Sequence, residues 1–372
     1  MATKKTLLLC FIHGFRGGNL TFGEDYQFTE HLRYNVAQSL PDITIKSLVY
    51  PRYETKGDLG ECVSRFRNWL EEKVIDMEVD AGTPSPTVDP SVRVILVGHS
   101  MGGIVAVETV LGIAAEKPIY SEDGVEKSEI LELNSLLFPY VQGVLAFDTP
   151  YLGIAPGVVA HGAESHYNTA ASTISQLSGL GATLWGANAA NKTVKAAPAA
   201  APAAWSKWSK VAMVAGAAGA VAAGGAAAWM NRDNIAQGWT WASSHLEFVG
   251  CLGRAEELKK RVKCMVQVSE ELHVGYANLY TRLGKGAEST QATMSKTILG
   301  KDRTFCNLPN KMQAGEWRPA VNDKAVDETT AHTTIFEAKN NPGFDQLTKD
   351  ATDLISTWVK NDWLKSSVGT TS

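Results

Sequence analysis

Short apolar runs alternate with amphipathic stretches through the first 150 residues and return near the C-terminus. Such runs predict strands, and apolar positions spaced three and four residues apart predict helices. The predicted strands cover residues 7–12, 43–50, 92–97, 141–147, 275–281 and 303–308, and the predicted helices 29–40, 59–79, 103–115 and 344–359. Because strands that alternate with helices form βαβ units, we expect an α/β fold with a mostly parallel sheet and helices on both faces.

The pattern changes between residues 151 and 274, where Ala, Gly, Ser and Trp dominate and strand signals are absent. This stretch is too long for an ordinary connection between strands. We interpret it as a helical cap inserted into a core formed by residues 1–150 and 275–365. Residues 366–372 are of low complexity and predict a flexible tail.

Residues 211–230 of this insertion carry no charge and are long enough to span a bilayer. Insertion into lipid depends on large apolar side chains, however, and this segment has mainly Ala and Gly and no Leu, Ile or Phe. Small residues recur every four positions and would let another backbone approach closely, in lipid or in protein. They are Ala212, Gly216, Ala220, Gly224 and Ala228. Two interpretations stay open: a cap helix that packs on protein, and a segment that contacts or enters a membrane.

The composition is that of a globular protein, with 44% hydrophobic and 20% charged residues in a chain of 372. A chain of this length can bury a full α/β core in one domain with a large insertion. The formal net charge of −4 and the absence of a dense Lys/Arg run argue against a nucleic-acid partner.

The cysteines and the N-terminus bear on the compartment. Five cysteines are scattered, odd in number and without the spacing of a zinc site, which fits reduced thiols inside the cell. They are Cys10, Cys62, Cys251, Cys264 and Cys306. Lys4 and Lys5 precede an apolar run as in a signal peptide, but the run is short and continues into His13 without a small-residue cleavage site. We therefore expect an intracellular protein, cytoplasmic or membrane-associated and not secreted.

A nucleophile motif lies between the strand predicted at 92–97 and the helix predicted at 103–115. Gly98-His99-Ser100-Met101-Gly102 has the G-x-S-x-G pattern of a sharp strand-to-helix turn. A serine hydroxyl is a weak nucleophile, and such a turn exposes it to a base while the helix N-terminus points N–H groups at developing negative charge. The motif predicts a serine hydrolase; the alternative is a tight turn in a glycine-rich chain.

A second turn motif ends the first predicted strand. The loop His13-Gly14-Phe15 is expected beside the nucleophile turn, at the same edge of the sheet. The backbone N–H groups of Phe15 and Met101 are therefore candidates for an oxyanion hole. A structural glycine turn is the alternative.

The general base is expected late in the chain if the order is serine, acid, histidine. His332 is the histidine beyond residue 273, in the connection before the final helix. We predict that it is the base, with a purely structural histidine as the alternative.

The acid that orients the imidazole has several candidates. Asp148 ends the strand predicted at 141–147, and catalytic groups collect at that edge of a parallel sheet. Asp327 and Asp323 precede His332 closely in sequence, and Asp302 lies further upstream. We favour Asp148 and keep Asp327 as the main alternative.

Three segments together resemble the serine esterase family of lipase-like α/β-hydrolases, in particular its fungal branch. They are Phe11-Ile12-His13-Gly14-Phe15, residues 98–103 and Thr149-Pro150-Tyr151-Leu152-Gly153, and the resemblance covers residues 5–155 and 275–360. It implies hydrolysis of carboxylic or lipid acyl esters, with Ser100 as nucleophile, His332 as base, and Phe15 and Met101 at the oxyanion positions.

The chain departs from this family at the acid. Relatives place it soon after a strand like Tyr276-Ala277-Asn278-Leu279-Tyr280, where this chain has Thr281-Arg282. Pancreatic-type lipases, which the chain also resembles here, carry the acid after the strand that follows the nucleophile helix. Asp148 matches that position.

The leading hypothesis is a serine esterase or lipase that needs neither a metal nor another cofactor. His332 would deprotonate Ser100, an acyl-enzyme would form, and water would release the acid, while the cap gates an apolar ester or lipid substrate. The alternative from another class is an inactive hydrolase fold that serves as a membrane-docked or interaction scaffold. A thioesterase or amidase would use the same machinery.

Overall fold

The computed structural model describes residues 5–15, 17–18, 20–53, 59–115, 133, 136–155, 158, 252, 254–288, 303–309, 315–361 and 363–365. The chain divides into two compact units, one formed by Met1–His161 with His245–Ser372 and the other by Gly162–Ser244. The second unit, with the apolar stretch 211–230, and the tail 366–372 lie outside the described residues.

The first unit is built on a parallel sheet of six strands in the order β2-β1-β3-β4-β5-β6. The strands are β1 (Thr6–Ile12), β2 (Thr44–Val49), β3 (Val92–His99), β4 (Val141–Phe147), β5 (Gly275–Leu283) and β6 (Glu316–Asn322). This topology, with helices on both faces and a strand-to-helix turn at Ser100, is that of an α/β-hydrolase fold. The predicted fold class is therefore confirmed.

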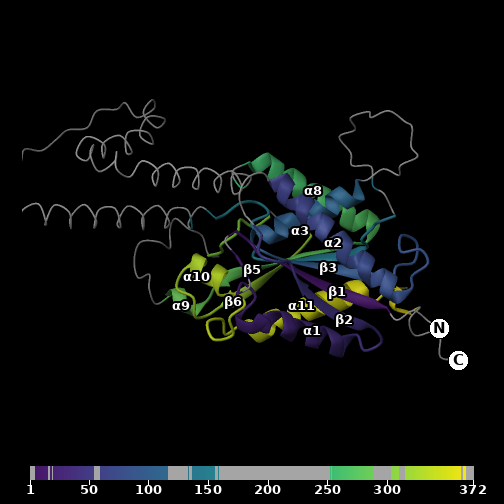
Figure 1. Cartoon of the computed structure of the whole chain (residues 1–372). Helices are drawn as coiled ribbons and strands as arrows, with labels where there is room; N and C mark the ends of the chain where they lie inside the picture. The colour runs from purple at the N-terminus through teal and green to yellow at the C-terminus, as the bar shows by residue number, and fades with distance from the viewer. Residues whose placement is uncertain are drawn as a thin grey trace, which may run out of the picture. The chain divides into compact units, whose positions relative to one another are not determined.

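Two layers of helices cover the sheet (Figure 1). One layer holds α2 (Leu59–Ala81), α3 (Met101–Ala114) and α8 (Ala255–Leu272), and the other holds α1 (Gln27–Ser39) and α11 (Phe344–Val359). Alternate residues of β1 enter the two cores, with Leu8, Cys10 and Ile12 on the side of α2 and α3 and Leu7, Leu9 and Phe11 on the side of α1 and α11. Because both faces are buried, the central strands read as continuous apolar runs.

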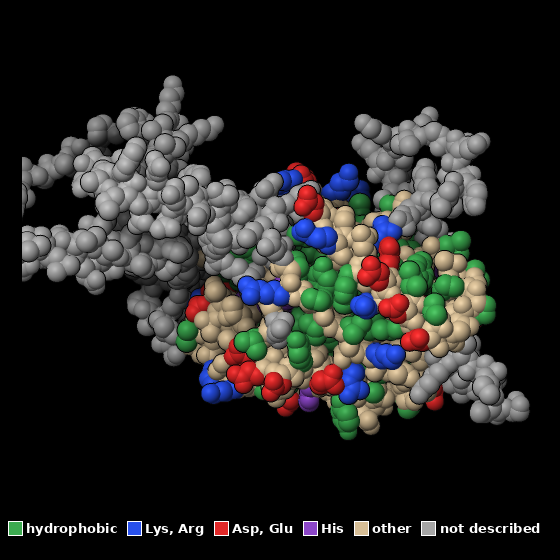
Figure 2. Space-filling view, viewed as in Figure 1, with side chains coloured by type: hydrophobic (Ala, Val, Ile, Leu, Met, Phe, Trp, Pro, Cys, Tyr) green, Lys and Arg blue, Asp and Glu red, His purple; other side chains and the backbone are tan. Residues whose placement is uncertain are grey.

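Shorter helical segments connect these elements. They are η1 (Glu24–Tyr26), α9 (Lys285–Glu288) and α10 (Glu328–Thr333). His332, expected in a connecting loop, lies on α10. None of the helices in the described ranges is long and apolar enough to cross a bilayer. On the face shown in Figure 2, basic and acidic side chains are interspersed among apolar ones.

The prediction of a strand at residues 303–308 is wrong. This segment makes only two isolated antiparallel bridges, Ile154 with Cys306 and Arg282 with Thr304. The sixth strand is instead β6, which the apolar pattern did not indicate. β6 lies at the sheet edge, is mostly half-exposed and contains Pro319, which an edge strand tolerates.

Helix α8 belongs to the unit that holds the sheet, although the sequence analysis assigned its residues to the insertion. Its apolar face packs on the core next to α3 and buries Leu258, Val262, Met265 and Val268. Arg261 on the same helix pairs with Glu108 of α3.

The order of the strands places the topological switch point between β1 and β3. From β1 the chain passes through α1 on one face to β2, and from β2 it passes through α2 on the other face to β3. Ligands of open α/β sheets bind outside the carboxyl ends of the strands at such a point. The loop after β1 and the turn at Ser100 both lie there.

Candidate active site

Ser100 occupies a strained turn between β3 and α3. Its backbone has φ 54° and ψ −127°, outside the regions that a residue with a Cβ normally adopts. Its N–H donates to the Phe147 carbonyl at 3.0 Å, which ties the turn to the end of β4. The side chain is partly exposed. The conformation and exposure match those of a nucleophile elbow.

The glycines of the motif are required by packing. A Cβ at Gly98 would lie 2.4 Å from the Gly103 Cα, and one at Gly102 would lie 2.2 Å from the Ile12 carbonyl oxygen. Larger residues at either position would push the turn away from β1 and α3. The G-x-S-x-G spacing therefore has a steric cause in this chain.

The loop after β1 contacts the Ser100 side chain. A Cβ at Gly14 would lie 2.7 Å from the Ser100 Cβ and 3.2 Å from its Oγ. Phe15 lies in the turn that Gly17 closes by donating its N–H to the Gly14 carbonyl at 3.0 Å. Met101 is the first residue of α3, so its N–H has no acceptor within the helix. Met101 thus adjoins Ser100 in the chain, and Phe15 adjoins Gly14, the residue of this loop that faces the Ser100 side chain.

His13 and Tyr53 hold this loop. The rings stack with centroids 4.5 Å apart, and the Tyr53 hydroxyl donates to the His13 carbonyl at 2.8 Å. The His13 Nδ1 lies 3.0 Å from the Gly14 carbonyl, to which it donates. No local sequence pattern indicated Tyr53, because its role depends on contacts across the fold.

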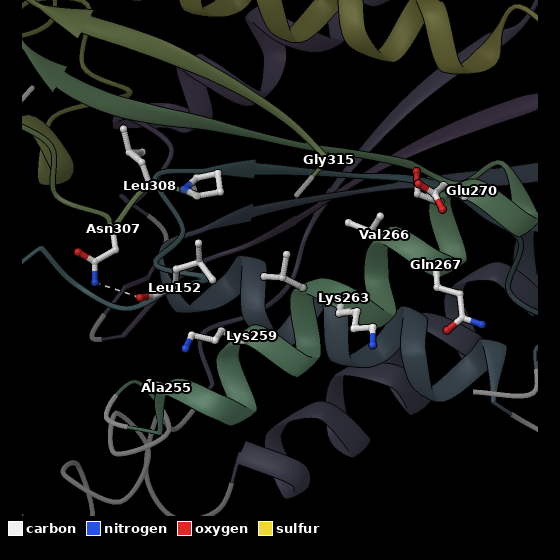
Figure 3. Close-up of a pocket in the computed structure, with 13 residues that line it drawn as sticks. Leu152, Ala255, Lys259, Lys263, Val266, Gln267, Glu270, Asn307, Leu308 and Gly315 are labelled. Atoms are coloured by element: carbon white, nitrogen blue, oxygen red, sulfur yellow. Dashed lines mark hydrogen bonds between the residues drawn. The ribbon is translucent and has the colours of Figure 1, made fainter. Parts of the chain in front are cut away.

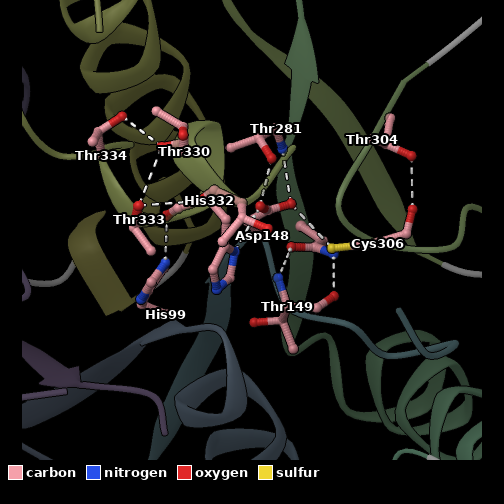
Figure 4. A network of polar contacts seen from close by, with 12 residues as sticks. His99, Asp148, Thr149, Thr281, Thr304, Cys306, Thr330, His332, Thr333 and Thr334 are labelled. Atoms are coloured by element: carbon pink, nitrogen blue, oxygen red, sulfur yellow. Dashed lines mark hydrogen bonds and ion pairs between the residues drawn. The ribbon is translucent and has the colours of Figure 1, made fainter. Parts of the chain in front are cut away.

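His332 and Asp148 form a hydrogen-bonded pair (Figure 4). The His332 Nδ1 lies 2.8 Å from the Asp148 Oδ2, although the two residues are 184 positions apart. Asp148 directly follows β4, is fully buried and has φ 48°. Its N–H donates to the Leu279 carbonyl at 2.9 Å, which fixes it beside β5.

Two further residues donate to the Asp148 carboxylate. The Thr281 N–H and the Cys306 thiol donate to Oδ1 at 2.9 and 3.0 Å, and the Thr281 hydroxyl donates to Oδ2. Burial by itself raises the pKa of Asp148, but the hydrogen bonds and charge of His332 and the bonds from Thr281 and Cys306 lower that pKa below its usual value. The carboxylate is therefore ionised at neutral pH and can stabilise an imidazolium.

Aromatic rings enclose the His332 imidazole on both faces. Phe305 stacks on it at 3.7 Å between centroids, and His99 stacks on it at 4.7 Å. The His99 Nε2 also lies 3.2 Å from the His332 carbonyl, to which it donates. With Nδ1 engaged by Asp148, Nε2 is the nitrogen left to act as a base.

The described residues contain no hydrogen bond between Ser100 and His332. His332 nevertheless stacks on His99, the neighbour of Ser100 in the chain. Hydroxyl and imidazole groups of hydrolases often come within hydrogen-bonding distance only when substrate is bound.

The alternative acids have other partners. Asp327 is the N-cap of α10 and accepts from the Thr330 N–H at 2.8 Å and the Thr330 hydroxyl at 2.7 Å. Asp323 accepts from the Lys285 N–H at 3.0 Å. Asp302 lies outside the described residues. Of these candidates, Asp148 is the one that the structure brings to the Nδ1 of His332.

Among the described residues, no cluster of His, Cys, Asp and Glu could hold a metal.

The buried His99 predicts a pH-dependent stability. Burial, with a smaller effect of His332, lowers the pKa of His99 from 6.5 to about 3, so the unfolded chain takes up this proton first as pH falls. The contribution of neutral His99 to the free energy of unfolding is fully present above pH 6.5. It is lost as the pH falls toward 3, at about 1.4 kcal/mol per pH unit for one proton. We expect His99→Gln to reduce the slope of the unfolding free energy against pH by this amount. The measurement is urea unfolding between about pH 7 and pH 4.5.

The matched control is His31→Gln, because His31 is exposed. Buried His13, whose pKa burial also lowers, keeps its contribution to the slope in both variants. The His31 variant should retain the wild-type slope. Equal slopes in the His99 variant and the wild type would contradict the burial of a neutral His99.

A groove of about 950 Å³ lies between α8 and the segment 307–309 (Figure 3). Its apolar lining includes Leu152, Val262, Val266 and Leu308, and Lys259 and Lys263 also line it. The Asn307 amide donates to the Leu152 carbonyl at 3.0 Å and joins the two loops at one end. Since Asn307 follows Cys306, this end of the groove begins next to a residue that contacts Asp148.

No family model matches the chain, and no curated protein matches it in sequence. The chain has a low similarity to several solved structures, among them the following three. Phospholipase PlaB from Legionella pneumophila is 15% identical over 40% of this chain and 26% of its own, with a TM-score of 0.26. A cutinase-like protein from Cryptococcus sp. is 15% identical over 40% of this chain and 55% of its own, with a TM-score of 0.23. Lipase 1 from Pelosinus fermentans is 11% identical over 95% of this chain and 99% of its own, with a TM-score of 0.31.

This chain thus spans about a quarter of the phospholipase's length. The names of these structural neighbours are those of a phospholipase, a cutinase-like protein and a lipase. Nothing in them supports the fungal branch expected from the sequence. The fold is assigned from the topology of the sheet and the turn at Ser100, because structural similarities this low do not establish a fold.

Proposed function

We propose that this protein is a serine hydrolase that cleaves carboxylic esters, with lipid acyl esters as its substrate class. The observation that carries the proposal is the strained turn at Ser100 beside a buried pair of His332 and ionised Asp148. Ser100 and Asp148 lie at the carboxyl ends of β3 and β4, where α/β sheets bind ligands, and His332 reaches Asp148 from α10. A scaffold has no use for a partly exposed serine held in such a conformation.

The proposed reaction begins with attack of the Ser100 Oγ on the ester carbonyl. The Nε2 of His332 takes the hydroxyl proton, and Asp148 stabilises the resulting imidazolium through Nδ1. The N–H groups of Phe15 and Met101 donate to the oxyanion of the tetrahedral intermediate, and one such donor contributes about 3 kcal/mol in a well-studied hydrolase.

The intermediate then collapses, and His332 returns its proton to the departing alcohol. The acyl group stays on Ser100 as an ester. A water molecule, deprotonated by His332, attacks this acyl-enzyme and releases the carboxylic acid, which regenerates the Ser100 hydroxyl. The scheme uses no metal and no other cofactor.

The groove along α8 supports the choice of lipid esters. Its volume of about 950 Å³ accommodates an acyl chain, which its apolar residues would contact, and its lining also includes polar residues such as Lys259, Lys263 and Glu270. Gating by the insertion, membrane contact through residues 211–230 and an intracellular location remain predictions. Residues 211–230 lie outside the described residues.

The alternative of an inactive scaffold draws on the absence of an acid directly after residues 276–280 of β5. Thr281 occupies that position, but it donates to Asp148, which reaches His332 from the end of β4. The interaction that a triad needs is therefore available from the neighbouring strand. Thioesters and amides would use the same residues and differ in the leaving group.

Labelling by a fluorescent fluorophosphonate tests the proposal. Attack of an activated serine oxygen on phosphorus expels fluoride and leaves a stable covalent adduct, so labelling reports the nucleophile without a known substrate. We expect the folded protein to be labelled at Ser100 and the heat-denatured protein to stay unlabelled. If folded protein stays unlabelled both with and without lipid vesicles, the hydrolase proposal fails and the scaffold remains.

A further inference from the structure

The segment 303–309 crosses the site and contacts both members of the acid–base pair. Phe305 stacks on the His332 ring, and the thiol of the next residue, Cys306, donates to Asp148. The two neighbours of Cys306 make backbone hydrogen bonds that hold the segment in place. The Phe305 carbonyl accepts from the Ala155 N–H at 2.8 Å, and the Asn307 N–H donates to the Gly153 carbonyl at 2.9 Å. We refer to residues 303–309 as the strap.

An ion pair joins the strap to the helix that carries His332. Arg303 makes two hydrogen bonds to Glu328 of α10, at 2.7 and 2.8 Å, and both side chains are largely buried. Bidentate pairs of this kind fix orientation as well as adding energy. The strap is therefore anchored to α10 at one end and to the loop after Asp148 at the other.

Each oxygen of the Asp148 carboxylate accepts two hydrogen bonds. Oδ1 accepts from the Thr281 N–H and the Cys306 thiol, and Oδ2 accepts from the Thr281 hydroxyl and His332. A carboxylate has about four lone-pair sites, so this buried group is fully paired. Without the thiol, Oδ1 would have a free site and would compete with Oδ2 for the His332 proton.

The sulfur of Cys306 acts as a donor in this arrangement. Burial, the charge of Asp148 and the hydrogen bond to it raise the pKa of the Cys306 thiol well above its usual value. The thiol therefore keeps its proton, and as a buried neutral group it is a poor nucleophile.

We propose that Cys306 is a positioning residue, whose thiol bond to Oδ1 keeps the Asp148 carboxylate in the rotation that presents Oδ2 to the Nδ1 of His332. Its effect on catalysis rests on the proposed hydrolase function, whereas its effect on the His332–Asp148 hydrogen bond does not. Cys306 touches no reacting atom in this proposal and acts through Asp148.

The test compares Cys306→Ala, which removes the donor, with Cys306→Ser, which retains one. Loss of a hydrogen bond to a charged group predicts a kcat lower by about 10- to 100-fold in the alanine variant, with KM nearly unchanged. The serine variant should recover most of the activity. Cys62→Ala, which removes another buried thiol on α2, is the matched control and should behave as wild type.

A spectroscopic measurement reports the hydrogen bond between His332 and Asp148 independently of activity. The proton between His332 and Asp148 should give a downfield resonance in ¹H NMR, assigned by its loss in His332→Gln. We expect this resonance in the wild type, and at the same position in Cys306→Ser and Cys62→Ala. In Cys306→Ala it should shift or broaden. Thermal unfolding of each variant identifies any loss that comes from instability alone.

The two proposals fail in different ways. If the resonance responds to Cys306→Ala but the wild type is not labelled by the fluorophosphonate, the hydrolase function is wrong and the positioning role stands. If the folded Cys306→Ala variant keeps the resonance and wild-type kcat, or if Cys306→Ser is as impaired as the alanine variant, the positioning role is overturned.

Discussion

Replacing Ser100 with alanine is expected to lower kcat for a chromogenic ester by about 10⁶-fold, the scale found when a hydrolase loses its nucleophile. The hydroxyl is what this change removes, since alanine keeps the Cβ. The backbone strain at φ 54° is therefore the same in both proteins, and the fold should survive. Initial rates of hydrolysis, measured beside the thermal unfolding midpoint, check the prediction.

A serine outside the site provides the control. Ser64 lies exposed on α2, where its hydroxyl donates to the Gly60 carbonyl at 2.9 Å. Ser64→Ala should hydrolyse the ester and react with the fluorophosphonate at the wild-type rate. A Ser100→Ala variant that keeps more than about a tenth of the wild-type kcat would rule out a covalent mechanism through this residue.

Replacing Asp148 with asparagine should lower kcat by about 10³- to 10⁴-fold, the scale expected when control of the imidazole tautomer is lost. Asparagine has one acceptor oxygen and one donor nitrogen. Its oxygen would accept the bonds that Thr281 and Cys306 give to Oδ1, which leaves its NH₂ facing the Nδ1 of His332.

An NH₂ group in that place favours the wrong form of the base. His332 would then accept at Nδ1 and carry its proton at Nε2, so it could not take the proton of Ser100. Binding of substrate does not depend on this proton, and KM should change far less than kcat. Steady-state kinetics with one ester, together with the His332 resonance, would separate the two effects.

Asp327→Asn is the matched control, since asparagine retains the oxygen that caps α10. This variant should keep kcat within about twofold of the wild type, because Asp327 bonds to Thr330 and the described structure gives it no bond to His332. Near-wild-type turnover in Asp148→Asn combined with a large loss in Asp327→Asn would move the acid to Asp327.

The central strands could be predicted from sequence because the sheet is covered on both faces. β1, β3 and β4 are almost wholly buried, so each appears as an unbroken apolar run. β6 gave no such signal, since an edge strand with exposed and charged positions resembles a loop. The strap was predicted to be a strand because Phe305, Cys306 and Leu308 are apolar, but it makes only isolated bridges, to Arg282 of β5 and to Ile154, and Thr304, Phe305 and Cys306 are its buried residues.

Some parts of the candidate site could likewise be predicted from sequence, and others could not. The turn at Ser100 was visible locally, because glycines at fixed offsets are the condition for that turn. His332 followed from its place in the order of the chain. For the partner of His332 the sequence favoured Asp148, because it ends a strand, but left Asp327 as an alternative, since Asp327 is near His332 in the chain and Asp148 is 184 residues away.

Sequence by itself determined the α/β class, the turn that carries Ser100 and the short set of residues that could complete a site. Each depends on local spacing, through hydrophobic periodicity or the steric demands of a turn. Only the tertiary structure decided that Asp148 meets His332, that Thr281 and Cys306 share its carboxylate, and that Phe305 and His99 enclose the imidazole. Threonine, cysteine and phenylalanine are ordinary core residues in a sequence, and they acquire these roles because parallel strands and the strap bring distant segments to one edge of the sheet.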